Sequence, residues 1–372
     1  MPTSTRSLLG RLVLLCAGIR IGLEAIGLVS LATDHQPVWP NALELWNRWD
    51  APHYLRLAEV GYVQSPTPPN TEDPFFVVFF PFYPFAVHIV SFVLQNLVLS
   101  GLVVSFAASV GAGYFLFRLV ALDTDEATAW RAVLLLFSFP TAYFLAAPYT
   151  EALFLFAVLA SVYAARTSRW SGAGVAGALA TGTRVTGIAL APALLAEVFA
   201  RKASVRDRVR ALAWISLASA GLLTYLAINR IVYGNPLWFL EVERTHYFQQ
   251  LVPPWEPLQE AVTALMAGVN DPTFTFIYVG RVAGTLVAVV LLGLAVRRLP
   301  LPDVLFGWTN LVLVLSSSWL IALPRYLLAL YPLFVVGARV SRPPAVFVPL
   351  VLAGAALQGW LMWRYSVGHW TF

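Results

Sequence analysis

Residues 98–119, VLSGLVVSFAASVGAGYFLFRL, decide the fold class of this chain. A helix needs about 20 mostly apolar residues to cross the hydrocarbon core of a bilayer, and this run reaches that length before its charged residue, Arg118. Of the 372 residues, 59% are hydrophobic and 12% are charged, whereas a soluble domain is about 45–50% apolar and about 25% charged. The bilayer is therefore the expected solvent of this protein.

Further apolar runs recur along the whole chain, at residues 8–32, 131–147, 149–166, 211–232, 276–296, 304–322, 326–340 and 345–363. Two more segments are ambiguous. Pro81 and Pro84 interrupt residues 76–96, and a polar stretch at 181–184 interrupts residues 171–199. The pattern predicts an all-α polytopic membrane protein, with a bundle of about 11 transmembrane or re-entrant helices in one domain over residues 1–372.

The net charge of +5 reflects membrane topology rather than nucleic-acid binding, because the basic residues lie at the ends of apolar runs. Arg6 and Arg11 predict a cytoplasmic N-terminus by the positive-inside rule. The other basic segments can share that side only if residues 76–96 lie on the outer face and residues 171–199 enter and return from one side. Each half of residues 171–199 has about 14 residues, or about 21 Å of helix, which is short of the roughly 30 Å core.

This topology leaves two large extracytoplasmic loops, at residues 33–97 and 233–275, while the cytoplasmic connections are short. In the first loop, Leu43, Trp46 and Trp49 recur at intervals of three, which predicts juxtamembrane amphipathic helices with a turn near Pro52. A protein with its bulk on the outer side is expected to work at that interface.

Asp50 is the leading candidate for a catalytic residue. It lies in the first loop between two aromatic residues, Trp49 and Tyr54. A carboxylate held there can accept a proton from a sugar hydroxyl. The structural alternative is that Asp50 caps the helix that follows, since Asp is a favoured N-cap and Pro is tolerated in the first turn. The two roles are compatible.

Three further polar residues stand at helix ends or breaks. Glu151 opens a strongly apolar helix, where it either binds acceptor hydroxyls or favours the positive end of the helix dipole. Arg184 lies at the break in residues 171–199, and an intramembrane arginine is a functional candidate by default. Arg325 follows Pro324 on an apolar outer turn, where its planar guanidinium suits a phosphate. Snorkelling to the interface is the alternative for Arg325.

Other charged residues are expected to be structural. Arg20 and Glu24 are spaced to form an i,i+4 pair in the first helix. The lone cysteine, Cys16, excludes an internal disulfide and a cysteine-based metal site. His246, in the second loop, suits acid–base work, although a lone histidine is more often structural. The sequence has no metal-ligand spacing, no phosphate-binding glycine loop and no nucleophile elbow.

Several segments together resemble the GPI mannosyltransferase 2 (PIG-V) family, in its bacterial branch, within the GT-C glycosyltransferase superfamily. They come in the family's order and span most of the chain: RWDAPHYLRLAEVGY at 48–62, FFPFYP at 79–84, FPTAYFLAAPYTEALF at 139–154, GTRVTG at 182–187 and LPRYLLALYPLF at 323–334. One departure is EDPFF at 72–76, where the family often has a Glu and small residues. This departure implies an acceptor other than a GPI intermediate.

The resemblance implies a GT-C-like fold and a membrane mannosyltransferase of the plasma membrane, with its active site on the extracytoplasmic face. It implies inverting transfer of mannose from a polyprenyl-phosphate donor to a glycan or glycolipid acceptor, with no required cofactor or metal. Membrane lipids and these two substrates are the expected partners, and nucleic acid is not. It further implies that Asp50 is the base, that the donor phosphate meets Arg325, Arg184 and Tyr326, and that the acceptor is supported by Glu151, His53, Tyr54 and Tyr149.

Two other functional classes remain open from the residues. A transporter or flippase of a lipid-linked precursor commonly has repeated halves with broken helices in matched positions. Here residues 171–199 are broken, and no matching second copy is seen. A structural subunit that supports another enzyme is the third class, and it would tolerate replacement of Asp50.

Overall fold

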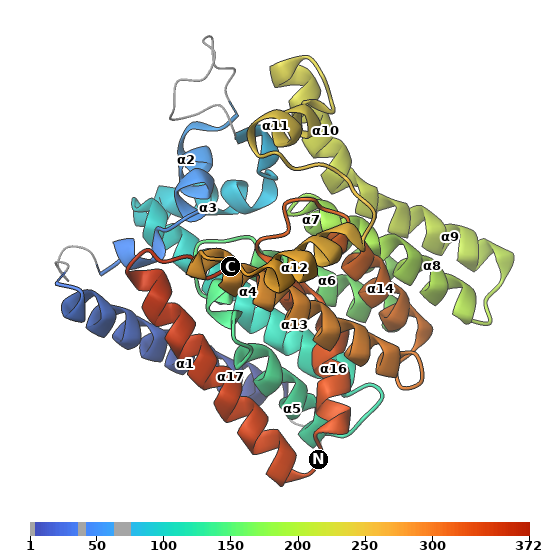
Figure 1. The fold of residues 1–372 in the computed structure, drawn as a ribbon. Coiled ribbons are helices and arrows are strands. Elements are labelled where there is room, and N and C mark those ends of the chain that lie inside the picture. Colours follow the sequence, from blue (N-terminus) through green and yellow to red (C-terminus); the bar gives the residue numbers. More distant parts are fainter. Residues whose placement is uncertain (1–3, 36–41, 63–75) are drawn as a thin grey trace.

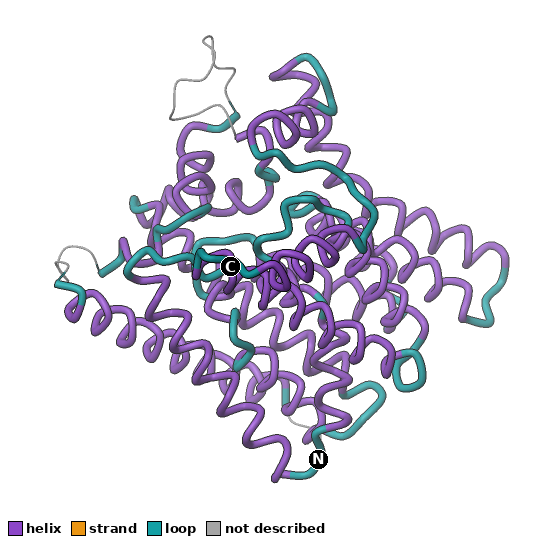
Figure 2. Tube along the Cα trace, viewed as in Figure 1, coloured by secondary structure: helices purple, strands orange, loops and turns teal. Residues whose placement is uncertain are grey.

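The computed structural model describes residues 4–35, 42–62 and 76–372. Within these ranges the chain is helical, with short loops between the helices (Figures 1 and 2). The described part contains no β-strand, and a lone bridge joins Leu251 to Ser317. The predicted all-α class is therefore confirmed.

Five helical segments are long and apolar enough to cross a membrane. They are α1 (Thr5–Thr33), α4 (Leu97–Val120), the continuous unit Val205–Tyr233, α13 (Pro272–Ala295) and α17 (Pro344–Ser366). The pair Leu323–Ala329 and Tyr331–Val340 bends by 80° and makes a sixth span if it is counted as one. The protein is thus a multi-pass membrane protein, whereas the exact count of about 11 stays a prediction.

The unit Val205–Tyr233 consists of α9 (Val205–Ile215), η5 (Ser216–Ser219) and α10 (Ala220–Tyr233). The bent pair consists of α15 (Leu323–Tyr326), η6 (Leu327–Ala329) and α16 (Tyr331–Val340). The remaining apolar runs form shorter helices and turns: α5 (Glu126–Phe137), η3 (Ala142–Leu145), α6 (Glu151–Arg166), α7 (Trp170–Thr181), η4 (Val185–Ala189), α8 (Leu190–Ala200) and α14 (Leu301–Leu315). These lie among the long helices (Figure 1).

Helix α6 lies at the centre of the bundle. Nearly all of its residues are buried, and it packs most extensively on α4 and α7. A strongly apolar helix that is covered all round belongs in the interior of a protein. Helix α6 therefore separates two charged residues at opposite ends of the bundle's interior, Glu151 at its start and Arg166 at its end.

Helices α7 and α8 form a hairpin along α6. The backbone N–H of Arg169 bonds to the carbonyl of Ala164, which places the start of α7 beside the end of α6. The side chain of Arg184 contacts Glu151 at the start of α6, and that of Arg201 contacts the carbonyl of Ala165 at its end. Residues 171–199 thus leave the Arg166 end of α6 and return to it, as the charge pattern required.

Small residues let these helices approach closely. A Cβ added to Gly174 in α7 would lie 2.0 Å from the carbonyl oxygen of Trp214 in α9. Such close backbone approach at small residues is typical of packing between membrane helices. The contact fixes the start of α7 against α9, the first helix of the Val205–Tyr233 unit.

The first loop folds into short helices: η1 (Glu44–Trp46), α2 (Ala51–Val60), η2 (Phe76–Val78) and α3 (Phe82–Leu94). Helix α3 is too short to span, which agrees with an outer-face position for residues 76–96. The expected surface helix around Trp46 is wrong, because only one 3-10 turn forms there and Trp46 is fully buried. Its indole N–H donates to Glu24 at 2.5 Å, which draws the ring inward.

The predicted pair of Arg20 and Glu24 is also wrong. Arg20 donates instead to the carbonyls of Leu102, at 2.8 Å, and Ala146. Glu24 instead accepts the Trp46 bond. Both side chains reach tertiary partners that satisfy them more fully than each other, and they tie α1 to α4 and to the first loop.

The second loop forms α11 (Trp238–His246) and α12 (Glu256–Ala267). Helix α11 packs on η2 of the first loop, so the two loops meet above the bundle (Figure 1). The buried Arg281 of α13 holds α12 by bonds to the Pro257 carbonyl at 2.9 Å and to Glu260 at 2.7 Å. Arg281 is therefore structural.

Candidate functional site

A pocket of about 300 Å³ opens where the two loops meet the bundle. Its lining comes from the start of α2, the η2–α3 segment, the break between α7 and η4, α11, α14 and α15. Five of the predicted site residues line it: Asp50, Tyr54, Arg184, Arg325 and Tyr326. Segments far apart in the sequence thus converge on one cavity.

Asp50 lies at the N-cap position of α2, but its side chain makes no capping bond. The carboxylate instead accepts a hydrogen bond from Nη1 of Arg325, with Oδ2 at 3.0 Å. Of the two readings of Asp50, the capping side chain is therefore not the one that the structure adopts. The carboxylate is 38% exposed while the Arg325 side chain is 10% exposed, so Asp50 is the more accessible partner.

Glu151 lies deeper and faces both arginines. Its Oε1 accepts from Nη1 of Arg184 at 2.8 Å and lies 3.2 Å from Nε of Arg325. The second contact is an ion pair without hydrogen-bond geometry, because Nε of Arg325 has no hydrogen-bond partner. Asp50, Arg325, Glu151 and Arg184 thus form a continuous chain of alternating charge, which limits the cost of burying each one.

One carboxylate oxygen among these four charged side chains has no hydrogen-bond partner in the described residues. Oε2 of Glu151 is buried and has no hydrogen-bond partner among the described residues. A buried acceptor without a donor costs about 1–3 kcal/mol. Oε2 of Glu151 is therefore an acceptor that the described part of the chain leaves unpaired.

Aromatic rings hold the two guanidinium groups in place. The Arg325 guanidinium lies 5.2 Å from the ring centre of Phe144, 5.4 Å from Tyr149 and 5.3 Å from Tyr326. Arg184 lies 5.2 Å from the same Tyr326 ring. Cation–π contacts of this kind fix the position of a cation without neutralising it. These rings therefore help to fix both guanidinium groups beside the pocket.

Tyr149 positions the start of α2 rather than lining the pocket. Its hydroxyl donates to the Arg48 carbonyl at 2.8 Å and accepts the backbone N–H of Asp50 at 3.1 Å. Burial raises the pKa of the Tyr149 phenol, so the hydroxyl stays a donor at neutral pH. Asp50 is thus held through its backbone while its carboxylate faces Arg325.

The two other aromatic candidates of α2 behave differently. Tyr54 lines the pocket and packs edge-on against Phe79, at 4.8 Å between ring centres. Burial, reinforced by the negative charge of Asp50, raises its pKa. His53 stacks on the same Phe79 ring at 5.4 Å and lies outside the pocket lining. The His53 ring therefore reaches the other candidates through Phe79, while its backbone N–H donates to the carbonyl of Asp50 at 3.1 Å.

Sequence reasoning missed several polar residues of the pocket, and two of them stand out. Asn310 of α14 is completely buried, and neither its Oδ1 nor its Nδ2 has a partner among the described residues. A lone amide inside the apolar run 304–322 was the available signal, since polar residues at membrane depth are functional candidates. The other residue is Glu243 of α11.

Glu243 shows its character only in the folded protein. Burial raises its pKa from 4.5 to about 7. Its neighbour in the sequence pattern, His246, is exposed and is held by the Thr245 hydroxyl at 2.8 Å. Besides Asp50, the pocket thus contains a carboxyl group whose raised pKa lies near neutral pH, that of Glu243.

The arrangement suits transfer of a group from a phosphate. Arginines held by aromatic rings stabilise negative charge on a leaving phosphate, and an accessible carboxylate can take a proton from an attacking hydroxyl. Both kinds of group occur here within one ion pair.

The predicted EDPFF departure lies outside the described residues except for Phe76, which is buried.

Comparison with models of known protein families gives a match. The family model described as mannosyltransferase (PIG-V) matches residues 24–229, which is more than half of the chain. The matched range includes Asp50, Glu151 and Arg184 and ends before Arg325. Among curated proteins and among solved structures, no match is found.

Proposed function

The chain belongs to the mannosyltransferase (PIG-V) family and is a membrane mannosyltransferase, and from this premise we propose that its donor is a polyprenyl-phosphate mannose. The proposed acceptor is an extracytoplasmic glycan or a lipid-linked glycan. The family match favours this reading over a transporter or flippase and over a structural subunit. The observation that supports the donor class is the pair of arginines beside a pocket in a membrane protein.

In the proposed reaction, Asp50 removes the proton from an acceptor hydroxyl. The hydroxyl oxygen then forms a bond to the anomeric carbon of mannose from the face opposite the phosphate. The bond between that carbon and the phosphate oxygen breaks, and the phosphate leaves with the electron pair. One displacement of this kind inverts the anomeric configuration.

In this scheme Arg325 contacts both the base and the leaving group. It holds the Asp50 carboxylate at 3.0 Å and presents its charge to the leaving phosphate. Arg184 and the Tyr326 ring complete the phosphate subsite, since both guanidinium groups stack on that ring. Preorganised cations of this kind stabilise charge that develops in a transition state.

The unpartnered groups are proposed to bind sugar hydroxyls. Oε2 of Glu151 lacks a donor, and Asn310 lacks both a donor and an acceptor. Sugar hydroxyls supply both functions. Tyr54 lines the same pocket, and Tyr149 holds Asp50 in place. A bound sugar thus resolves the polar groups that the folded chain leaves unpaired.

The proposed site lies on the extracytoplasmic face of the plasma membrane. Glu151 marks one end of α6, and the basic residues near Arg166 and Arg201 mark the other. The positive-inside rule places the basic end in the cytoplasm. The pocket at the Glu151 end then faces outward, together with both long loops.

Replacement of Asp50 tests the proposed base. Membranes with the Asp50→Asn variant are incubated with radiolabelled polyprenyl-phosphate mannose and an extract of membrane acceptors. General-base catalysis contributes about 10²–10⁴-fold, so the rate of transfer is expected to fall by that order. The control is Glu59→Gln, on the same helix, where the carboxylate is exposed and paired with Arg56. Transfer by Asp50→Asn at the rate of this control would exclude Asp50 as the base.

A further inference from the structure

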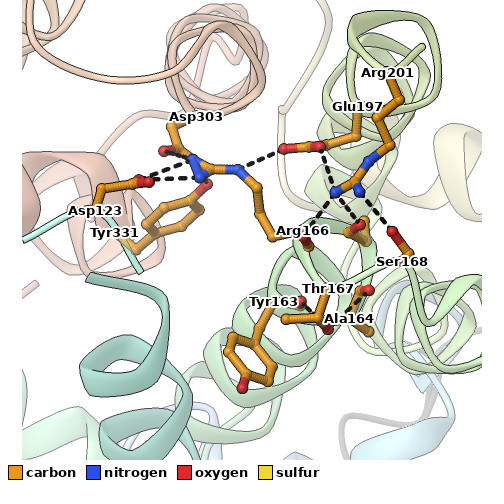
Figure 3. A network of polar contacts seen from close by, with 11 residues as sticks. Asp123, Tyr163, Ala164, Arg166, Thr167, Ser168, Glu197, Arg201, Asp303 and Tyr331 are labelled. Atoms are coloured by element: carbon orange, nitrogen blue, oxygen red, sulfur yellow. Dashed lines mark hydrogen bonds and ion pairs between the residues drawn. The ribbon is translucent and has the colours of Figure 1, made fainter. Parts of the chain in front are cut away.

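The end of α6 opposite Glu151 carries two neighbouring charged regions of different character. In the first, Arg166 is surrounded by carboxylates: Glu197 at 2.5 Å, Asp123 at 3.1 Å and Asp303 at 3.1 Å (Figure 3). Tyr331 donates to Asp303 at 2.6 Å and completes the network. The positive charge of Arg166 is therefore fully compensated by its own contacts.

The second region is a pocket of about 950 Å³ between the start of α7, the end of α8 and the first part of α9. We call it the basic pocket. Five cations line it: Arg169, Arg201, Lys202, Arg208 and Arg210. The carboxylate in this lining, Asp207, accepts a hydrogen bond from the Ser204 hydroxyl at 2.7 Å at the α9 cap. The lining thus has a large excess of positive charge.

Most of this charge has no counter-charge in the protein. Arg201 is engaged, because it donates to Ser168 at 2.5 Å and to the carbonyl of Arg166 at 2.7 Å (Figure 3). Within the described ranges, however, Arg169, Lys202 and Arg210 form no ion pair or side-chain hydrogen bond. Cations that converge on a cavity and outnumber its one carboxylate favour an anionic ligand.

The first turn of α7 adds to this potential. Trp170 and its next two neighbours line the basic pocket, and Arg169 at the N-cap makes no side-chain capping bond. The free N–H groups at a helix start carry partial positive charge and favour anions. This effect supports the cation cluster and does not replace it.

The surroundings of the basic pocket identify the source of the anion as a membrane lipid. Trp170 and Trp214 line it, and tryptophan is enriched at the headgroup level of bilayers. Helix α9 begins the continuous span Val205–Tyr233. On its outer surface, Val205 and Val209 are exposed and lie one turn apart. A headgroup in the pocket therefore leaves its acyl chains beside apolar side chains.

We propose that the basic pocket binds the phosphate headgroup of an anionic phospholipid from the leaflet on the basic side of the protein. Basic pockets between membrane helices on this side suit such headgroups. The site is separate from the mannosyl-transfer pocket, because Arg184 and Arg201 contact opposite ends of α6. Lipid binding there does not depend on the proposed donor or base.

Direct lipid binding by the purified full chain tests the proposal. Delipidated protein in detergent is titrated with phosphatidylglycerol or with phosphatidylcholine of identical acyl chains, and bound lipid is counted by native mass spectrometry. The test variant is Arg169→Gln/Lys202→Gln/Arg210→Gln, whose replaced side chains are exposed and form no ion pair or side-chain hydrogen bond among the described residues. The control is Arg206→Gln/Arg297→Gln/Arg298→Gln, which removes the same charge from exposed residues outside the pocket lining.

Wild-type protein is expected to prefer phosphatidylglycerol, and the test variant is expected to bind it about 100-fold more weakly, since each cation near a bilayer surface contributes several-fold. The control variant is expected to retain most of the affinity. Equal losses in the two variants would show that only overall charge matters and would overturn the proposal. So would equal binding of both lipids by wild type. Displacement of phosphatidylglycerol by an equal concentration of inorganic phosphate would assign the pocket to a free anion instead.

Discussion

Nη1 of Arg325 lies 3.0 Å from Oδ2 of Asp50, although 275 positions separate the two residues in the chain. This pair joins the first loop to α15, which is the short first half of the bent unit. Because Tyr149 holds the Asp50 backbone at the same time, the carboxylate is fixed from two sides. The proposed base and the proposed phosphate ligand are thus parts of one contact.

The first prediction concerns Arg325. Its replacement by Ala removes the proposed charge-assisted hydrogen bond to the donor phosphate, and a bond of this kind contributes about 1.5–3 kcal/mol. We expect the KM for polyprenyl-phosphate mannose to rise by roughly 10–100-fold, and the KM for the acceptor to change less. Steady-state assays that vary each substrate in turn measure both constants. An unchanged donor KM in Arg325→Ala would remove this residue from the phosphate subsite.

Replacement of Asn310 is expected to raise the stability of the folded protein and to lower its activity. Its buried amide has no partner, so replacement by the similar-sized Leu should stabilise the folded protein by about 1–3 kcal/mol. The same change should lower kcat/KM by about tenfold or more, because a sugar hydroxyl then loses its partner. Thermal unfolding in detergent and transfer assays on one preparation measure the two effects. A gain in stability with full activity would make Asn310 a purely structural residue.

Glu243 predicts a pH dependence of stability. Burial raises its pKa from 4.5 to about 7, so the folded state binds the proton more tightly than the unfolded state does. This contribution to stability is fully present below about pH 4.5 and is lost as the pH rises through about 7. Thermal unfolding between pH 4.5 and pH 8 should therefore show a decline that the Glu243→Gln variant lacks.

A control for this experiment lies two residues earlier on the same helix. Glu241 is paired with Arg244 at 2.7 Å, and hydrogen bonding to that arginine lowers its pKa. Glu241→Gln should therefore leave the decline between pH 4.5 and pH 7 in place. If both variants keep the wild-type profile, Glu243 does not titrate in this range.

Arg166 is predicted to act on folding rather than on transfer. Replacement by Gln leaves Asp303 buried without a cation and leaves Glu197 with its longer contact to Arg201, at 3.4 Å. Breaking a buried ion pair from one side costs about 3–5 kcal/mol. We expect the Arg166→Gln variant to accumulate poorly and to unfold at lower temperature. Protein that does fold should transfer mannose at a normal rate per molecule, measured after correction for the folded fraction. A selective loss of rate would contradict a structural role.

Much of the helical framework could be predicted from hydropathy, because a long apolar run has few alternatives in a bilayer. The run 98–119 became α4 (Leu97–Val120), and residues 171–199 formed the expected hairpin. The pair Arg20 and Glu24 failed because helical spacing only allows a contact. Carbonyls of other helices and the Trp46 indole compete for the same groups, and these partners are invisible in local sequence.

The candidate site was predictable as residues and not as contacts. Asp50, Glu151, Arg184 and Arg325 each stood out as charged groups at the edge of apolar runs, yet their pairing depends on packing across the whole chain. Asn310 could have been recognised as an isolated amide at membrane depth. Glu243 could not, because its raised pKa comes from burial that α11 acquires only when the two loops meet.

Helix α6 sets a fixed separation between the two polar centres of the molecule. It has 16 residues, and at 1.5 Å per residue its ends stand about 24 Å apart. Its rotation is equally constrained, since each added residue turns everything beyond it by about 100°. Glu151 and Arg166 must both meet partners from other helices. Helix α6 therefore tolerates substitutions far better than insertions or deletions.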